Sequence, residues 1–205
     1  MTTRAGFVAL IGEPNAGKST LLNRMVGAKV SIVTHKVQTT RARIRGVAME
    51  GDAQLVFVDT PGLFQPRRRL DRAMVAAAWG GAADADVIVL LIEAHRGMTE
   101  GVERILEELG NIAKGRRVAL AINKIDRPNA NVDRVKQQLG EHKLAPESWG
   151  GDTVTVEVSA KMKQNLDELL EMLSLTAEMQ ELTASPTVPA RGTVLEAQLD
   201  RQRGP

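Results

Sequence analysis

The sequence contains no cysteine, which excludes disulfide bonds and thiolate metal sites. It also lacks a long hydrophobic run, because its longest apolar stretches, such as residues 87–92, are far too short to span a bilayer. Residues 1–6 carry no apolar segment of the kind found in secretory signals. We therefore expect a cytoplasmic protein without membrane attachment.

A strong net charge of either sign is absent as well. The 27 Lys and Arg residues nearly balance the 25 Asp and Glu residues, which leaves a formal net charge of +2. RNA binding cannot be argued from so small an excess. With 43% hydrophobic residues, the 205-residue chain can bury one core, so we expect a monomer with one domain over residues 1–182. Residues 183–192 have a linker composition, and we expect residues 183–205 to be a linker and the truncated start of a following domain.

Apolar, β-branched runs alternate along the chain with segments of helical periodicity. The predicted strands are residues 6–11, 41–47, 54–58, 86–92, 117–122 and 153–158. The predicted helices are one that begins near residue 19 and those at residues 98–113, 132–143 and 165–179. This alternation predicts an α/β fold with a mostly parallel sheet, and the polar alternation of residues 41–47 is typical of an edge strand.

Residues 12–19, GEPNAGKS, match the pattern G-x-x-x-x-G-K-[ST] between an apolar strand and a helix. Glycines let such a loop curl so that backbone N–H groups point at phosphate oxygens, and the following helix directs its positive dipole end to the same place. Lys18 adds a positive charge, and Ser19 adds a hydroxyl for Mg²⁺. The segment therefore predicts a nucleotide-binding loop.

Asp59 begins the sequence DTPG directly after the predicted strand at residues 54–58. A carboxylate at the end of that strand lies beside the phosphate loop in a parallel sheet and can hold Mg²⁺ through water. The N–H of Gly62 can then face a terminal phosphate. DTPG alone would be an ordinary turn, so its position after a phosphate loop carries this interpretation.

Two later segments are typical of a guanine pocket. Residues 123–126, NKID, follow a predicted strand, and the carboxylate of Asp126 can accept from both the N1–H and the exocyclic amine of guanine. Adenine lacks this pair of donors, so Asp126 can discriminate strongly between the two bases. Residues 159–161, SAK, end the next strand, where a backbone N–H can face the base and Lys161 can lie along its plane.

These four motifs, in this order, resemble those of P-loop GTPases of the translation-factor-related class. The resemblance covers about residues 6–182 and implies a Ras-like G domain, with a mixed, mostly parallel sheet of six strands and five helices. It implies GTP or GDP with Mg²⁺ as the ligand. The implied nucleotide-binding residues are Asn15, Ala16, Gly17, Lys18, Ser19, Thr20, Asp59, Gly62, Asn123, Lys124, Asp126, Ser159, Ala160 and Lys161. The implied metal ligands are Ser19, Thr40 and Asp59, and the implied catalytic residues are Lys18, Thr40 and Gly62.

Within this class the chain resembles two families. Residues 1–122, including the segments GEPNAGKSTLLN, VQTTR and DTPGL, resemble the Era family of ribosome-assembly GTPases. Residues from about 123 to 205, including WGGDT and VEVSAK, resemble the G domain of bacterial translation initiation factor two. We interpret the sequence as a chimera with a seam within residues 116–128. The RNA-binding KH domain of the Era family is expected to be absent.

The leading hypothesis is a GTP-hydrolysing switch of the Era type, for which the resemblance implies ribosome assembly with 16S rRNA and the small subunit as partners. The alternatives are an initiation-factor-type G domain and a nucleotide-binding module without productive catalysis. Leu63 stands where relatives carry a water-orienting Gln or His, so we expect slow intrinsic hydrolysis. Asn15 resembles the asparagine with which some relatives bind K⁺ beside the phosphates, although it also fits the loop turn.

Overall fold

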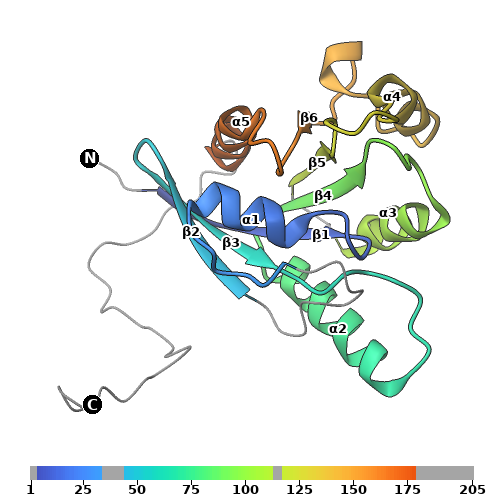
Figure 1. Cartoon of the computed structure of the whole chain (residues 1–205), viewed down its shortest axis with the longest axis horizontal. Coiled ribbons are helices and arrows are strands. Elements are labelled where there is room, and N and C mark those ends of the chain that lie inside the picture. Colours follow the sequence, from blue (N-terminus) through green and yellow to red (C-terminus); the bar gives the residue numbers. More distant parts are fainter. Residues whose placement is uncertain (1–3, 34–43, 113–116, 179–205) are drawn as a thin grey trace.

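A computed structural model describes residues 4–33, 44–112 and 117–178, and six strands in these segments form one sheet (Figure 1). The strands are β1 (Arg4–Gly12), β2 (Ile44–Glu50), β3 (Ala53–Asp59), β4 (Val87–Glu93), β5 (Arg117–Asn123) and β6 (Thr155–Val158). Their order is β2-β3-β1-β4-β5-β6, and only β2 runs antiparallel to its neighbour. The strands alternate with helices, which is why most of the strand pairs are parallel.

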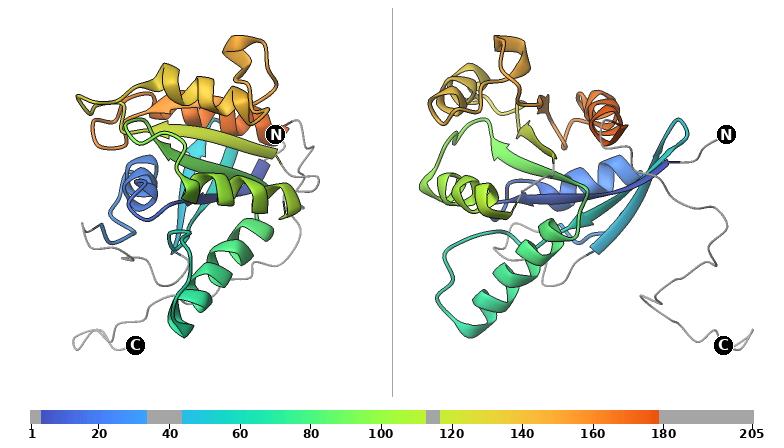
Figure 2. Two further views of the ribbon diagram at one scale, coloured as in Figure 1. Left: turned by 90° about the vertical axis from the view of Figure 1, so that its right-hand side faces the viewer. Right: turned by 180° about the vertical axis from the view of Figure 1, so that it is seen from behind.

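Helices cover both faces of the sheet (Figure 2). They are α1 (Lys18–Val26), α2 (Arg69–Ala83), α3 (Glu100–Ile112), α4 (Val132–Glu141) and α5 (Leu166–Glu178), with a 3₁₀ turn η1 (Glu147–Trp149). Buried side chains of α1 and α5 share one core cluster with the sheet, and those of α2, α3 and α4 share the other. The chain is thus a three-layer α/β fold.

The central strand β4 is buried along its whole length. Its odd-numbered residues from Val87 to Leu91 pack in the core beneath α1 and α5, and its even-numbered residues from Ile88 to Ile92 pack beneath the other three helices. Successive side chains of a strand point to opposite faces, so a strand between two helical layers must be apolar throughout. This explains the unbroken hydrophobic run in the sequence.

The predicted fold class is confirmed, with a mixed, mostly parallel sheet of six strands. The edge strand predicted at residues 41–47 is β2, and its first three predicted residues lie outside the described residues. The periodicity did not reveal α2, although the resemblance implied five helices. Its buried positions are Met74, Ala78, Gly81 and Ala82, and such small side chains give little apolar contrast.

Residues 183–205, expected to be a linker and a truncated start, lie outside the described residues. In the part of the chain that the structure describes, no helix combines the length and apolar character that a membrane crossing requires.

The packing of α5 against the sheet predicts a large difference between two leucines of this helix. Leu169 is 0% exposed and Leu175 is 48% exposed. Leu169→Ala leaves a cavity between α5 and the sheet and should lower the free energy of unfolding by about 2–5 kcal/mol. The control Leu175→Ala should change it by less than about 1 kcal/mol. Urea denaturation followed by circular dichroism measures both values, and equal losses would contradict this packing.

Candidate functional site

The carboxyl ends of the central parallel strands lie in register at one edge of the sheet. Leu10 of β1 is paired with Asp59 of β3, and Glu93 of β4 is paired with Asn123 of β5. Parallel strands all end at the same edge, so the loops that follow them meet there although they are distant in the sequence. This edge is where the sequence motifs come together.

The loop between β1 and α1 is curled by residues in the left-handed region. Asn15 has φ of 64° and Gly17 has φ of 105°. A Cβ on Gly17 would lie 2.2 Å from Nδ2 of Asn123, so no larger residue fits there. α1 begins at Lys18, and its first turn therefore presents N–H groups at this loop, as an anion site requires.

Lys18 lies inside the curl of the loop rather than in solvent. Its Nζ donates to the backbone oxygens of Gly12 at 3.1 Å and Glu13 at 2.9 Å, and the residue is 6% exposed. Burial lowers the pKa of Lys18 to about 8, although the carboxylates of Asp59, Glu13 and Glu93 partly offset this effect. A cation at the N-terminus of a helix, beside the N–H groups of its first turn, is arranged to meet an anion.

The carboxylate of Asp59 accepts hydrogen bonds from two serine hydroxyls beside the phosphate loop. The residue is 0% exposed, and its Oδ2 accepts from Ser19 Oγ at 2.6 Å and from Ser31 Oγ at 2.7 Å. Carboxylate and hydroxyl oxygens are the ligands that Mg²⁺ prefers, so this donor set fits the ion. The described residues contain no group of three His, Cys, Asp or Glu that could hold a metal ion, so a metal here would also need hydroxyl ligands. Thr40, the other predicted ligand, lies outside the described residues.

Ser31 was not predicted from the sequence. The side chain of Asn23 on α1 fixes its position, because Asn23 Nδ2 donates to Ser31 O and Asn23 Oδ1 accepts from Ser31 N, both at 2.8 Å. No pattern marks Ser31, since its place depends on this side-chain clamp. The clamp brings a second hydroxyl to Asp59.

The segment after β3 is fastened to the phosphate loop. Leu63 N donates to Gly12 O at 2.9 Å, and Thr60 Oγ1 donates to Leu10 O at 2.7 Å. A Cβ on Gly62 would lie 2.7 Å from Cα of Pro14, so this close approach needs glycine. Leu63 is 3% exposed and packs in the core beneath α2, which directs its side chain away from the loops.

Asn123 joins three of the loops through its amide group. Its Nδ2 donates to Ala16 O at 2.9 Å, and its Oδ1 accepts from Ala160 N at 3.2 Å. The side chain is buried, and both polar ends are paired within the protein. The sequence predicted that a backbone N–H of the SAK segment can face the base. In the structure the N–H of Ala160 donates to Asn123 Oδ1.

The other residues of the NKID and SAK segments are also held by specific bonds. Lys124 Nζ donates to Asn15 O at 2.6 Å and forms an ion pair with Glu93. Asp126 Oδ1 accepts from Ser159 Oγ at 2.6 Å, which fixes the orientation of the carboxylate. Glu93 belongs to none of the motifs and was not predicted.

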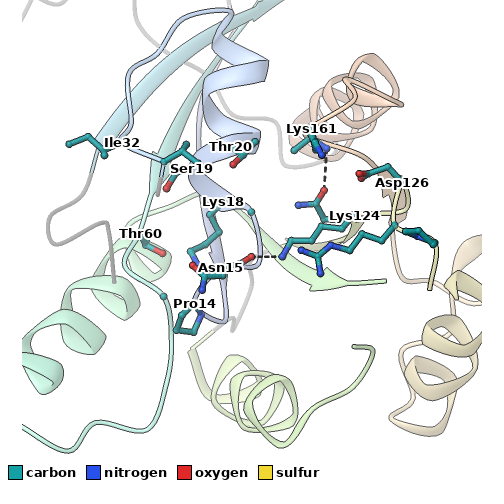
Figure 3. A pocket seen from close by; sticks show the side chains of 17 residues that line it. Pro14, Asn15, Lys18, Ser19, Thr20, Ile32, Thr60, Lys124, Asp126 and Lys161 are labelled. Carbon is teal, nitrogen blue, oxygen red and sulfur yellow. Dashed lines mark hydrogen bonds between the residues drawn. The ribbon is translucent and has the colours of Figure 1, made fainter. Parts of the chain in front are cut away.

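These segments line one pocket with a volume of about 720 Å³ (Figure 3). The predicted residues that line it are Asn15, Gly17, Lys18, Ser19, Thr20, Gly62, Asn123, Lys124, Asp126, Ala160 and Lys161. Ala16, Asp59 and Ser159 do not line it, but they bond to residues that do. Pro14, Ile32, Val33, Thr60, Arg127 and Pro128 line it as well and were not predicted. In Figure 3, the side chains of Lys18, Lys124, Asp126 and Lys161 surround the pocket from three segments.

A family model described as "50S ribosome-binding GTPase" matches residues 7–124. The chain belongs to this family. Curated relatives include GTPase Era of Dinoroseobacter shibae, which is 79% identical over 131 residues, 63% of this chain and 42% of that protein. GTPase Era of Brucella suis is 62% identical over 125 residues, 61% of this chain and 40% of that protein. The chain thus spans about two fifths of the length of these relatives.

Solved structures of Era extend the similarity over most of the fold. A crystal structure of Era in complex with MgGDPNP and nucleotides 1506–1542 of 16S ribosomal RNA has a TM-score of 0.72 and 34% identity. The aligned region covers 91% of this chain and 60% of the Era chain. A variant of Aquifex aeolicus Era bound to GDP·AlF₄⁻ has a TM-score of 0.71 at 35% identity, with the same coverage. The chain is therefore an Era-like GTPase G domain in sequence and in fold.

The bonds of Asn123 predict a stability effect that does not depend on any ligand. Asn123→Ala leaves Ala16 O and Ala160 N buried without this partner, which should lower the free energy of unfolding by about 2–4 kcal/mol. The control Asn111→Ala changes an exposed residue of α3 and should have an effect within about 0.5 kcal/mol. Urea denaturation without nucleotide gives both values. A loss at Asn123 no larger than at Asn111 would contradict the linking role.

Proposed function

We propose that this chain is a GTP-binding and GTP-hydrolysing switch domain of the Era type. The observation that carries the proposal is the convergence of four distant sequence segments on one pocket, in a chain that belongs to a GTPase family. A pocket of about 720 Å³ is of the size that ligand sites commonly have.

The base end of the pocket suits guanine. Ser159 holds the carboxylate of Asp126, which lines the pocket and offers acceptors for the two adjacent N–H donors of guanine. Lys124 and Lys161 line the same end and have long apolar stems that can lie against a ring. Adenine would leave the carboxylate without matching donors, so the site selects against it.

The phosphate end suits a nucleoside di- or triphosphate with a metal ion. Lys18 and the N–H groups of the loop and of α1 would bind the phosphates, and Gly62 would present its N–H to the terminal one. Ser19, Asp59 and, by the family resemblance, Thr40 would hold Mg²⁺, which when bound neutralises phosphate charge. MgGDPNP is the ligand of the similar Era structure.

We propose that intrinsic hydrolysis is slow. Positioning and charge neutralisation supply most of the catalysis of phosphoryl transfer, and the loop provides both. The side chain at position 63 cannot orient water, because Leu63 is apolar and packs in the core. A K⁺ ion beside Asn15 would supply additional positive charge next to the phosphates, and we propose that it raises the rate of hydrolysis.

The proposed partners are 16S rRNA and the small ribosomal subunit. The support is the similar Era structure, which holds nucleotides 1506–1542 of 16S ribosomal RNA. This chain covers 60% of that protein, so the proposal concerns the switch that reports the nucleotide state rather than the whole RNA contact.

A second candidate is a composite chain whose later part is an initiation-factor-type G domain. It rests on the sequence resemblance of these later residues, which lie beyond the end of the family model at residue 124, whereas the Era structure covers 91% of the chain. In this candidate, residues from about 123 to 205 derive from an initiation factor, while Leu63 replaces the His that such factors carry. The chain would then meet the ribosome during translation initiation.

Nucleotide binding and turnover test the leading proposal directly. Fluorescent mant-GDP should bind more tightly than mant-ADP by a factor on the order of 10⁴, because adenine leaves Asp126 unmatched. Phosphate release from GTP with Mg²⁺ should be slow and should rise when K⁺ replaces Na⁺.

Asp126→Asn is the matched control for base recognition. It replaces one acceptor oxygen by a donor and should remove most of the selectivity without unfolding the chain. A folded wild-type chain that fails to bind mant-GDP would overturn the proposal. Tight binding with no phosphate release under any condition would leave a nucleotide-binding module without catalysis.

The lowered pKa of Lys18 predicts a pH dependence of GDP affinity. Below pH 8 the amine carries its charge and binds phosphate, and above pH 8 the neutral form grows, so affinity should fall about tenfold between pH 7 and pH 9. Lys18→Gln has no titrating amine, so its weaker affinity should change by less than about twofold over the same range. A flat wild-type profile in fluorescence titrations would contradict the role of Lys18.

A further inference from the structure

Glu93 is a buried acid that none of the sequence motifs contains. It is the last residue of β4, it is 6% exposed, and it lies in register with Asn123. Carboxylates are seldom buried to this degree unless cations compensate them. Glu93 does not line the nucleotide pocket, so direct contact with the nucleotide does not account for it.

The cations around Glu93 lead to the phosphate loop by two routes. Lys124 Nζ forms an ion pair with Glu93 and donates to Asn15 O of the loop at 2.6 Å. Arg96 lies 3.5 Å from Glu93 Oε1 and 3.3 Å from Glu13 Oε2, and Glu13 is also a loop residue. The carboxylate therefore connects the end of β4 to both sides of the loop.

The backbone conformation of Lys124 depends on contacts such as its ion pair with Glu93. Lys124 has φ of 65°, a left-handed conformation that L-residues adopt rarely and that surrounding contacts must stabilise. Its side chain is 19% exposed and lies near Lys18, whose positive charge repels it. Glu93 is the carboxylate paired with Lys124, and its other charged or titratable neighbours are His95, Arg96 and Lys18.

We propose that Glu93 is a positioning residue for nucleotide binding, which holds Lys124 against the backbone of the phosphate loop. The inference rests on the proposed function, since it assigns a role within the same pocket. The pair keeps the stem of Lys124 at the base end and keeps Asn15 O turned toward Lys124. Without the carboxylate, a chain that is still folded presents a less ordered pocket to the nucleotide.

The test compares Glu93→Gln with a matched acid elsewhere on the sheet. Glu157 of β6 pairs with Lys136 of α4, away from the pocket lining, so Glu157→Gln removes a Glu–Lys pair in which the acid is 37% exposed, against 6% for Glu93. Titration of the full chain with mant-GDP should show about ten- to hundredfold weaker binding for Glu93→Gln. The control should bind within about twofold of wild type.

A double-mutant cycle separates positioning from general stability. If Glu93 acts through Lys124, then Glu93→Gln in a Lys124→Gln background should weaken mant-GDP binding by less than about twofold further. All titrations are made at a temperature where circular dichroism shows each variant folded. If Glu93→Gln does not fold, Glu93→Asp takes its place. This variant keeps the charge but shortens the side chain, so it should also weaken mant-GDP binding. Its control, Glu157→Asp, should leave binding unchanged.

Each outcome decides one question. Weaker binding by the folded Glu93 variants, with coupling to Lys124, supports the positioning role. Wild-type affinity in Glu93→Gln or Glu93→Asp overturns it, and so does an undiminished effect of Glu93→Gln in the Lys124→Gln background. A wild-type chain that binds no mant-GDP overturns the proposed function itself, which is a separate result seen before any variant is made.

Discussion

The candidate site depends on one constraint, which is that the loops after four strands must be held beside one another by bonds within the protein. The amide of Asn123 meets this constraint most directly, because one end bonds to the phosphate loop at Ala16 and the other to the loop after β6 at Ala160. Buried amides of this kind are costly to leave unpaired, so the loops and the side chain stabilise each other. Bonds within the fold thereby organise the pocket.

Charge balance is the second condition on the same region. A site for phosphates needs cations, yet Lys18 is buried and its pKa is lowered to about 8 by the loss of solvent. Acids close to the loop offset that cost without occupying the pocket, and Asp59, Glu13 and Glu93 all favour the charged amine. The acids close to the loop and the lysines that line the pocket thus form one arrangement, in which the acids help to keep Lys18 charged.

The sequence predicted the parts of the site that follow fixed spacings. Most residues of GEPNAGKS, DTPG, NKID and SAK line the pocket or bond to residues that do, because parallel strands bring their ends to one edge. It did not predict Ser31, whose position is set by the Asn23 side chain, or Glu93, which ends an otherwise apolar strand. The periodicity also missed α2, because three of the four buried residues of this helix are alanine or glycine. Residues placed by side-chain contacts with other elements leave no local pattern.

The family match ends at residue 124, yet β6 and α5 complete the sheet and its core without a break. The loop after β6 contributes two donors to the site. The backbone N–H of Ala160 donates to Asn123, and the hydroxyl of Ser159 donates to Asp126. Their positions depend on the register of β6 against β5, in which Val158 is paired with Asn123. The site requires a strand in this register followed by a turn that places these two groups, while Pro128 lines the pocket and Val135 and Leu139 fill the core. The register of β6 against β5 therefore places both groups of the later part beside Asn123 and Asp126.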